Sequence, residues 1–293
     1  MKEMFHSFLN YWSKDIYNVQ AIRWFRFGIF AILLFQTIVL CLPVADLIWG
    51  VDSLVKSVRY PNTWTYNFYM ALHHGNFASY YPYLIAVQLV GLILGIMRKF
   101  TRISSILVYV TTVLLFNRVY LVITGGNYLI HIFLFYLIFV NENGKRAGIN
   151  AFLSNAFIWA CRIQVIYVYF FASIYKLTGE TWMNGSALKY LLNMQEFSLP
   201  FMVGNMGNMD WLLTLGTYLS LGYQLFFPML VWFKKIKIPY LILGVCFHVA
   251  TIVIMGIPVF GLIMIVSYII FLNDAELKGL FSTKRKASSL MTN

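Results

Sequence analysis

Long runs of apolar residues alternate with short polar stretches along the chain. A helix needs about 20 largely apolar residues to cross the hydrocarbon core of a bilayer, and fewer where neighbouring protein covers it. The pattern therefore predicts about eight membrane-crossing helices, of which the fourth and the last are the shortest. The predicted segments are Trp24–Leu42, Tyr81–Met97, Ile103–Ile123, Tyr128–Val140, Phe152–Leu177, Trp211–Phe233, Ile238–Met255 and Ile257–Leu272.

The composition agrees with a membrane protein and argues against a soluble one. Of the 293 residues, 60% are hydrophobic and 11% are charged, and the mean hydropathy is +0.73. A soluble domain usually carries about 25% charged residues, so this chain has more apolar surface than it could bury in water. We therefore expect one all-α domain over residues 1–293, a polytopic bundle of transmembrane helices embedded in a lipid bilayer.

The net charge of +12 is compatible with nucleic-acid binding, but the positions of the basic residues indicate membrane orientation instead. Most of the 22 Lys and Arg residues fall in segments that about eight helices with an inside N-terminus would leave in the cytoplasm. The outer loops of this arrangement hold only Lys56, Arg59 and Lys189. The positive-inside bias therefore predicts that both termini are cytoplasmic, and we expect no nucleic acid as a partner.

The two ends of the chain lie outside the predicted bundle. Residues 1–22 carry an amphipathic pattern, which predicts a segment on the membrane surface and no removable signal peptide. Residues 273–293 end in KRKASSLMTN and predict a basic cytoplasmic tail that is disordered or lipid-associated. The apolar positions of the first segment are Phe5, Phe8, Leu9 and Trp12.

The two longest loops both fall on the predicted outer side. Ile48–Tyr80 is rich in aromatic residues, which are typical of the membrane interface. Thr178–Asp210 contains a helical pattern over Gly185–Met194, which we expect to lie on the membrane. Because the other loops are short, any chemistry is expected to face the outer side.

Lys176 is the most informative polar residue inside an apolar run. It follows the aromatic stretch from Tyr167 to Tyr175, and the predicted topology places it at the outer end of the fifth helix. One interpretation is a lysine whose ammonium group reaches the interface, which is common at the ends of membrane helices. The other is a lysine held in an apolar pocket, where it could lose its proton and serve as a base. The sequence alone leaves both open.

Other polar residues also occur within the predicted helices. Arg162 and Gln164 lie near the inner end of the fifth helix, where Arg162 fits the inner positive belt equally well. Arg118, beside Asn117, lies deeper and would have to reach a carbonyl, a tyrosine, a lipid phosphate or a bound anion. Acidic residues are scarce in the predicted helices, so we expect neither an ion pair within the membrane nor the carboxylate relay of a proton-coupled transporter.

The sequence contains no metal-binding or nucleophile motif. His131 and His248 lie in apolar runs, where a histidine is more often a hydrogen-bonded packing residue than a catalytic one. Cys41, Cys161 and Cys246 also lie in apolar runs, so we expect free thiols. Since HExxH, a Cys/His cluster and GxSxG are absent from the sequence, no protein-bound metal is expected.

The run from Arg162 to Ala187, RIQVIYVYFFASIYKLTGETWMNGSA, resembles the signature helix and turn of the HTTM domain. This is the membrane domain of vitamin K-dependent γ-glutamyl carboxylase and its bacterial relatives. The length of the chain is similar to that of the short bacterial branch related to sporulation-delaying protein B, which helps mature an exported peptide toxin. Further stretches that resemble the family are Phe25-Arg26-Phe27 with Gly28 and Ile29, Gly125-Gly126-Asn127-Tyr128, and His248 with Met255-Gly256, Phe260 and Met264.

The resemblance implies a site with a lysine base. Lys176 would deprotonate a reduced naphthoquinone of the vitamin K type, and His248 and Asn127 would be the other catalytic groups. Two positions differ from the family pattern: Tyr128 stands where a histidine is expected, and Gln224 stands where an acid is often found. The other residues implied to line the pocket are Tyr128, His131, Arg162, Gln164, Tyr167, Trp182 and Gln224.

Two functional hypotheses follow from the resemblance. The first is a carboxylase-like protein of the bacterial cytoplasmic membrane that modifies or matures an exported peptide supplied by a partner. The second is a non-enzymatic membrane component of a peptide toxin maturation, export or immunity complex. A lipid or small-molecule transporter ranks third, because neither inverted repeats nor paired broken helices are evident.

Overall fold

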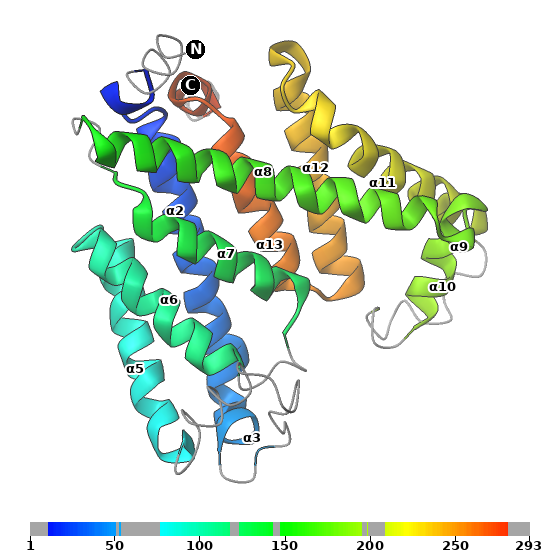
Figure 1. The fold of residues 1–293 in the computed structure, drawn as a ribbon. Coiled ribbons are helices and arrows are strands. Elements are labelled where there is room, and N and C mark those ends of the chain that lie inside the picture. Colours follow the sequence, from blue (N-terminus) through cyan, green and yellow to red (C-terminus); the bar gives the residue numbers. More distant parts are fainter. Residues whose placement is uncertain are drawn as a thin grey trace, which may run out of the picture. The chain divides into compact units, whose positions relative to one another are not determined.

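A computed structural model describes residues 11–50, 53, 77–117, 123–142, 147–194, 198 and 209–280. Throughout these residues the chain forms helices, turns and irregular segments, and no strand. Each predicted apolar run coincides with a helix in the structure (Figure 1). The elements are α2 Val19–Phe35, η1 Gln36–Cys41, η2 Leu42–Val44, α3 Ala45–Trp49, α5 Phe77–Ile96, α6 Thr101–Asn117, α7 Gly125–Phe139, α8 Ile149–Leu177, α9 Glu180–Met183, α10 Ala187–Asn193, α11 Asp210–Leu230, α12 Lys234–Met255, α13 Pro258–Ser267 and η5 Tyr268–Phe271.

Four helices in the described part of the chain are long and apolar enough to cross a membrane. Three further apolar helices are shorter, and α11 is not among the four. The all-α membrane protein expected from the sequence is thus supported by these four helices. The four are Val19–Trp49, Ser79–Ile96, Ile149–Leu177 and Lys234–Met255.

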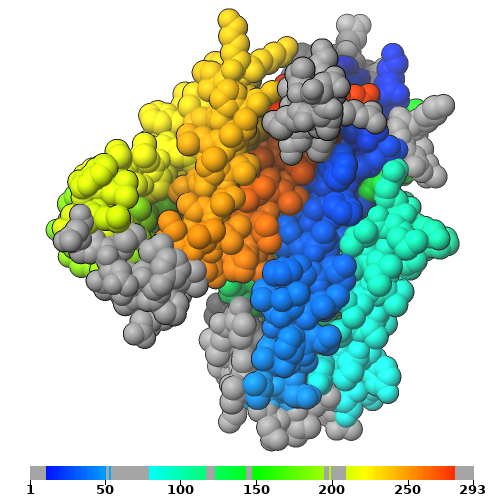
Figure 2. Space-filling model, turned by 180° about the vertical axis from the view of Figure 1, so that it is seen from behind, coloured from blue at the N-terminus to red at the C-terminus, as the bar shows by residue number. Residues whose placement is uncertain are grey.

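Apolar side chains also cover outward-facing surfaces of the helices. Figure 2 shows one face of the molecule, on which α2 (blue) and α12 (orange) are visible. Large apolar residues of both helices are exposed, as suits a surface in contact with lipid. They include Trp24, Phe27 and Phe35 on α2, and Ile242, Leu243, Val249 and Val253 on α12.

The chain divides into two compact units, residues 1–158 and 159–293. In the first unit, α2, α5, α6 and α7 lie side by side (Figure 1). The ring of Phe25 packs edge-on against that of Phe133, with 5.1 Å between the ring centroids. A Cβ atom at position 95 would overlap the ring of Phe30, so Gly95 allows α2 and α5 to approach closely.

A buried polar layer crosses the first unit. The hydroxyl of Thr37 lies 3.1 Å from Oε1 of Gln88, and Nε2 of Gln88 donates to the hydroxyl of Thr112 at 2.8 Å. All three residues are buried, so each polar group satisfies another inside the unit. Thr37 lies in η1, a π-helical turn that interrupts the Val19–Trp49 helix.

The N-terminal segment is only partly described. Residues 11–14 are helical and α2 begins at Val19, five residues before the predicted start of the first membrane segment at Trp24. The carboxamide of Asn155 on α8 accepts from the backbone N–H of Tyr17 and donates to the carbonyls of Trp12 and Asp15. These bonds tie the segment to α8. The predicted apolar positions Phe5, Phe8 and Leu9 lie outside the described residues.

The second unit contains α9 to η5 and the part of α8 from Trp159 onward. Gly256 ends α12 with a φ of 66°, a left-handed conformation that glycine adopts without strain. Pro258 then begins α13, where its missing N–H group is not needed. This pair of residues produces the tight turn between the two helices.

The predicted cytoplasmic tail is helical where the structure describes it. Residues 274–280 form a helix that continues from η5, and its start is capped by reciprocal bonds between Asn273 and Glu276. Nζ of Lys237 lies 2.7 Å from Oε2 of Glu276, so the tail helix is ion-paired to α12. Residues 274–280 are therefore not disordered, and the alternative of a lipid-associated tail stays a prediction; residues 281–293 lie outside the description.

Candidate functional site

Lys176 lies in the last turn of α8, where a cation interacts favourably with the carbonyl end of the helix dipole. Its Nζ atom donates a hydrogen bond to Oε1 of Gln224 on α11, at 2.6 Å. The same atom lies 4.4 Å from the ring centroid of Trp182, a cation–π distance. The amine is therefore held between three elements of the second unit, namely α8, α9 and α11.

Both of these Lys176 partners are electrically neutral. None of the ion pairs formed by the described residues includes Lys176. Lys176 does interact electrostatically with His248, the other predicted catalytic group of this unit. An amine held by an amide oxygen and an aromatic face can gain or lose a proton without breaking an ion pair.

The turn that carries Trp182 is fixed against α11. The hydroxyl of Tyr218 donates to the carbonyl of Met183 at 2.9 Å, just after Trp182. Gly185 has a φ of 79°, and a Cβ atom there would lie 2.7 Å from Cγ2 of Thr214. Glycine is therefore required twice at this position, for its backbone conformation and for the close approach to α11. These contacts hold the indole beside the Lys176 amine.

A chain of buried hydrogen-bonding groups lies in the same unit. The hydroxyl of Tyr169 on α8 lies 2.7 Å from Nε2 of His248 on α12 and also contacts the hydroxyl of Tyr268. The Tyr268 hydroxyl lies 2.9 Å from that of Tyr223 on α11. Three of these side chains are 3% exposed or less, and Tyr223 is 6% exposed. Four elements thus contribute one polar group each to a single chain.

Gly244 provides the space for these hydroxyl groups. A Cβ atom at this position would overlap the hydroxyl of Tyr223 and lie 2.6 Å from that of Tyr268. The Tyr240 hydroxyl, one helical turn earlier, donates to the backbone carbonyl of Tyr223 at 2.5 Å. The missing side chain of Gly244 therefore lets α12 approach α11 and η5 closely enough to close the chain.

The chain can be hydrogen-bonded in either of two directions. If Nε2 of His248 accepts, then Tyr169 donates to it and accepts from Tyr268, which in turn accepts from Tyr223. If Nε2 carries the proton, every bond reverses. In both cases Nδ1 of His248 is buried without a hydrogen-bond partner in the described chain. An unsatisfied buried polar atom costs about 1–3 kcal/mol, so its presence usually has a functional reason.

Tyr169 and Lys176 share one face of α8. They are seven residues apart, which is close to two helical turns, and Ser173 lies between them on the same face, fully buried. On α11, the ring of Tyr223 packs edge-on against that of Tyr169, and the next residue, Gln224, accepts from Lys176. The lysine and the tyrosine chain are therefore supported by the same pair of helices.

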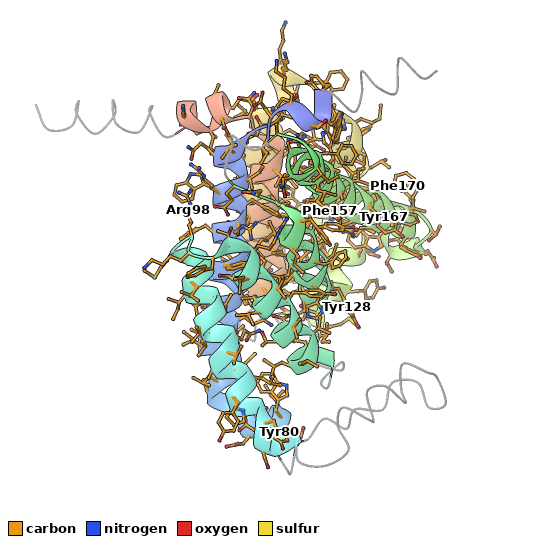
Figure 3. All side chains as sticks on the ribbon, turned by 60° about the vertical axis from the view of Figure 1, so that its left-hand side comes forward. Tyr80, Arg98, Tyr128, Phe157, Tyr167 and Phe170 are labelled. Carbon is orange, nitrogen blue, oxygen red and sulfur yellow. The ribbon has the colours of Figure 1, made fainter. Side chains whose placement is uncertain are left out.

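Three other predicted pocket residues on α8 do not join this group. The Nε atom of Arg162 donates to the carbonyl of Ile270 at 2.8 Å, and its guanidinium lies over the ring of Trp159. Gln164 is half-buried, and Tyr167 is 54% exposed with its ring against that of Phe171. Figure 3 labels Tyr167, which belongs to the exposed side of α8.

The remaining predicted residues belong to the first unit. The carboxamide oxygen of Asn127 accepts from the backbone N–H and the hydroxyl of Thr124, which forms a capping box at the start of α7. Tyr128, labelled in Figure 3, is 40% exposed. Nε2 of His131 is buried without a hydrogen-bond partner among the described residues, and its ring packs edge-on against Phe116. The side chain of Asn127 is thus used to cap the start of α7.

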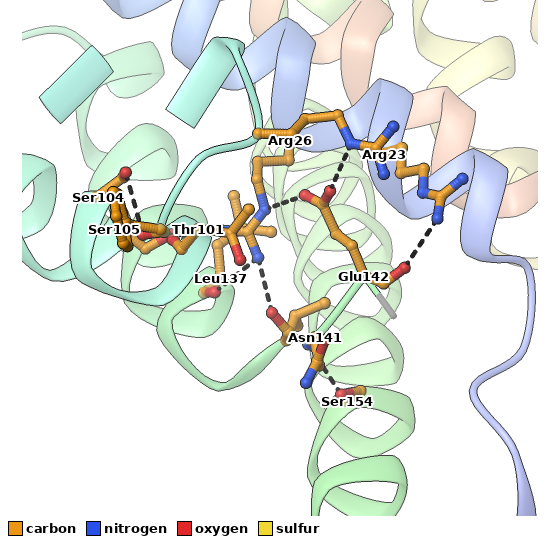
Figure 4. A network of polar contacts seen from close by, with 12 residues as sticks. Arg23, Arg26, Thr101, Ser104, Ser105, Leu137, Asn141, Glu142 and Ser154 are labelled. Atoms are coloured by element: carbon orange, nitrogen blue, oxygen red, sulfur yellow. Dashed lines mark hydrogen bonds and ion pairs between the residues drawn. The ribbon is translucent and has the colours of Figure 1, made fainter. Parts of the chain in front are cut away.

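A buried ion pair lies inside the first unit and was not singled out by the sequence pattern. Nε of Arg26 lies 2.5 Å from Oε1 of Glu142, and the two side chains are 1% and 3% exposed. Glu142 lies just after the end of α7, so this acid belongs to the polar residues that follow the apolar helix and contacts Arg26 from there (Figure 4). Glu142 lies just beyond the predicted fourth membrane segment, Tyr128–Val140, so the expectation that no ion pair forms within the membrane stays a prediction. Arg118 lies outside the described residues.

Sequence reasoning did not single out the tyrosines of the chain. Tyr169 lies in the aromatic run before Lys176, and no motif in the sequence marks Tyr223 or Tyr268. One usable signal is the seven-residue spacing between Tyr169 and Lys176, and another is the position of Tyr223 next to Gln224. The described residues contain no cluster of His, Cys, Asp and Glu that could hold a metal ion.

Comparisons of this sequence with protein-family models and with curated proteins, and of the structure with solved structures, find no match.

Proposed function

We propose that the chain is a polytopic protein of the bacterial cytoplasmic membrane with about eight membrane segments and both termini in the cytoplasm. Two observations support this arrangement. Each predicted segment contains a helix among its described residues, and the basic residues follow the positive-inside bias. The short helices α7 and α13 would cross the membrane where neighbouring helices cover them.

Within this membrane protein, Lys176 acts as a base at the outer end of α8, as in the γ-carboxylase family that the sequence resembles. The observation that carries this proposal is the contact of Nζ with Gln224 Oε1 and the Trp182 ring, in place of a carboxylate. A base must exchange its proton during a reaction cycle, and a permanent ion pair would oppose that exchange. Gln224 departs from the acid often found there in the family, and this departure favours the second, non-enzymatic function described below.

A reduced naphthoquinone suits the chemistry of these groups. Its hydroxyl groups would donate to an amine, and its flat rings would pack against aromatic side chains such as Trp182. Lys176 and Gln224 would hold the polar edge, and His248 would be a further polar group of the same unit. When bound, the quinone would supply the oxygen-driven basicity that removes a carbon-bound proton from a glutamate side chain. The protein substrate would be an exported peptide supplied by a partner.

Substitution of Lys176 tests this proposal directly. Membranes containing the wild-type chain would be given a glutamate-rich reporter peptide, reduced naphthoquinone and labelled bicarbonate. We expect incorporation of label by the wild type and by Lys189→Ala, which removes an exposed lysine nearby. Lys176→Ala and Lys176→Arg should both abolish incorporation at unchanged protein abundance, since arginine keeps the charge but does not release its proton. Equal incorporation in all four proteins would remove Lys176 from the mechanism.

The packed tyrosines favour a second function, that of a non-enzymatic membrane component in peptide toxin maturation, export or immunity. The hydroxyls of Tyr223 and Tyr268 fill the space beside Gly244, so this part of the unit is already occupied by side chains. A scaffold of this kind would bind its exported peptide partner without chemistry. Lys176→Ala would then leave partner maturation in cells unchanged, whereas an enzyme would lose it.

A further inference from the structure

Three arginines surround one carboxylate at an end of the first unit. Arg23 and Arg26 come from α2, Arg98 comes from the turn between α5 and α6, and Glu142 follows α7. Figure 4 shows Arg23 and Arg26 approaching Glu142 from the same helix. The ends of four helices therefore meet at this acid.

Arg26 is ion-paired with the carboxylate, and both of its Nη atoms donate hydrogen bonds inside the unit. Beyond its ion pair with Glu142, its guanidinium donates to the carbonyls of Leu137 and Val140 at 3.0 and 2.7 Å, and to the hydroxyl of Ser105. Both charges are buried, so this pair is closed to any other ligand. Its role is to join α2, α6 and α7.

Arg23 and Arg98 have hydrogen-bond donors to spare. Arg23 donates through Nη2 to the backbone carbonyl of Glu142 at 3.1 Å, while its Nε is buried without a partner among the described residues. Arg98 is bonded through Nε to Oε2 of Glu142 at 3.3 Å, and its side chain is 51% exposed. A guanidinium carries five donor N–H groups, so most of those on these two residues are available.

The charges around Glu142 do not balance. One carboxylate faces three guanidinium groups, and the ion pairs of the described residues bring no second carboxylate to this end. Lys99 and Arg102 add two exposed positive charges nearby in the chain. Arg98 also has a φ of 59°, an unusual conformation for a residue other than glycine. The turn thus holds this guanidinium beside a centre that already carries excess positive charge.

We propose that Arg23 and Arg98 bind the phosphate group of an anionic phospholipid at this end of the first unit. A phosphate oxygen pair matches the planar fork of a guanidinium, and the negative charge would offset the surplus. Arg23 lies on α2 and Arg98 follows α5, and both helices are apolar and expose side chains suited to lipid, so a phospholipid headgroup would lie near the arginines. A free phosphate ion offers the same chemistry and is the second source to be distinguished.

Native mass spectrometry of the purified full chain in a neutral detergent tests this site. Phosphatidylglycerol and phosphatidylcholine are titrated separately, and the fraction of protein with bound lipid is measured. We expect phosphatidylglycerol to bind more tightly, and Arg23→Gln to weaken it about fivefold, the change expected for one basic residue at an anionic surface. Phosphatidylcholine carries the same phosphate beside a choline cation, so its weaker binding should fall by less. Arg23 bonds only a backbone carbonyl among the described partners, so this variant keeps the Arg26–Glu142 pair.

Arg102→Gln is the matched control, because it removes an exposed arginine from the same end. Equal weakening by Arg23→Gln and Arg102→Gln would overturn the proposal and leave only diffuse attraction, as would no weakening by either. Arg23→Lys should lose part of the affinity, since lysine keeps the charge but not the fork.

Inorganic phosphate is then added as a competitor. If inorganic phosphate at millimolar concentration does not displace phosphatidylglycerol, the lipid is the ligand. Displacement by phosphate at low concentration would assign the site to the free ion and overturn the proposal of a lipid ligand.

Discussion

The hydroxyl of Tyr169 lies 2.7 Å from Nε2 of His248, although the two residues are 79 positions apart in the chain. This contact joins α8 to α12 and is continued by the hydroxyls of Tyr268 and Tyr223. It also leaves Nδ1 of His248 buried without a hydrogen-bond partner among the described residues. Four predictions follow from this and related contacts.

Tyr169→Phe should destabilise the chain. The substitution leaves the ring in place but removes the hydroxyl that bonds both His248 and Tyr268. Two buried groups would lose a partner, which costs about 1–3 kcal/mol each. Thermal unfolding in detergent measures the loss. Tyr167→Phe, on the exposed side of the same helix, is the control and should change stability by less than about 0.5 kcal/mol. Equal stability of the two variants would contradict the role of the chain.

Gly244→Ala should disturb the same chain by crowding. The new methyl group would overlap the hydroxyl of Tyr223, and overpacking of this kind costs about 1–3 kcal/mol. Gly222→Ala on α11 meets no atom within 4 Å and should be neutral or stabilise the helix by about 0.5–1 kcal/mol. Adding Tyr223→Phe to Gly244→Ala should recover part of the loss, because it removes the overlapping oxygen. A double variant no more stable than Gly244→Ala would show that another contact limits the approach.

Glu142→Gln should be among the most damaging substitutions in the first unit. It leaves Arg26 buried without a counter-charge, and breaking a buried ion pair in this way costs about 3–5 kcal/mol. Asp210→Asn breaks the Lys189–Asp210 pair, in which both side chains are at least half exposed. That exposed pair should contribute only about 0–1 kcal/mol. Chemical unfolding of the two variants side by side measures the difference, and similar losses would argue against a buried pair.

Lys237→Met should release the helix at residues 274–280. The substitution removes the ammonium group that bonds Glu276 and the carbonyl of Phe271. We expect faster hydrogen exchange of the backbone amides in this helix, measured by mass spectrometry on the detergent-solubilised chain. Lys235→Met, which removes an exposed lysine two residues earlier, should leave exchange unchanged. Unchanged exchange in both variants would mean that other contacts hold the tail helix.

The sequence was sufficient to predict the helices but not their polar partners. Apolar runs mark helices because burial in lipid or protein requires continuous apolar surface, and α5, α8 and α12 begin within about four residues of the predicted starts. Gln224, the partner of Lys176, is 48 residues away on a separate helix, so only the family resemblance, and no local pattern, indicated that it shares a pocket with the lysine. Glu142 was missed for a related reason: it lies in a polar stretch after an apolar run, where an acid usually faces solvent.

The π-helical turn at Gln36–Cys41 lets one long helix serve two sets of neighbours. Before the turn, α2 directs Arg26 to Glu142, and after it α3 directs the indole N–H of Trp49 to the carbonyl of Leu115 at 2.8 Å. Each residue of a regular helix advances by about 100°, so a wider turn shifts the angular phase of everything that follows. The wide turn holds one residue more than a regular turn, so deleting one residue here would restore a regular winding and leave both Arg26 and Trp49 directed as they are, whereas a deletion in the regular part of α2 after Arg26 would rotate Trp49 off α6. The π-helical turn therefore sets the direction in which the side chains after it point, relative to the side chains before it.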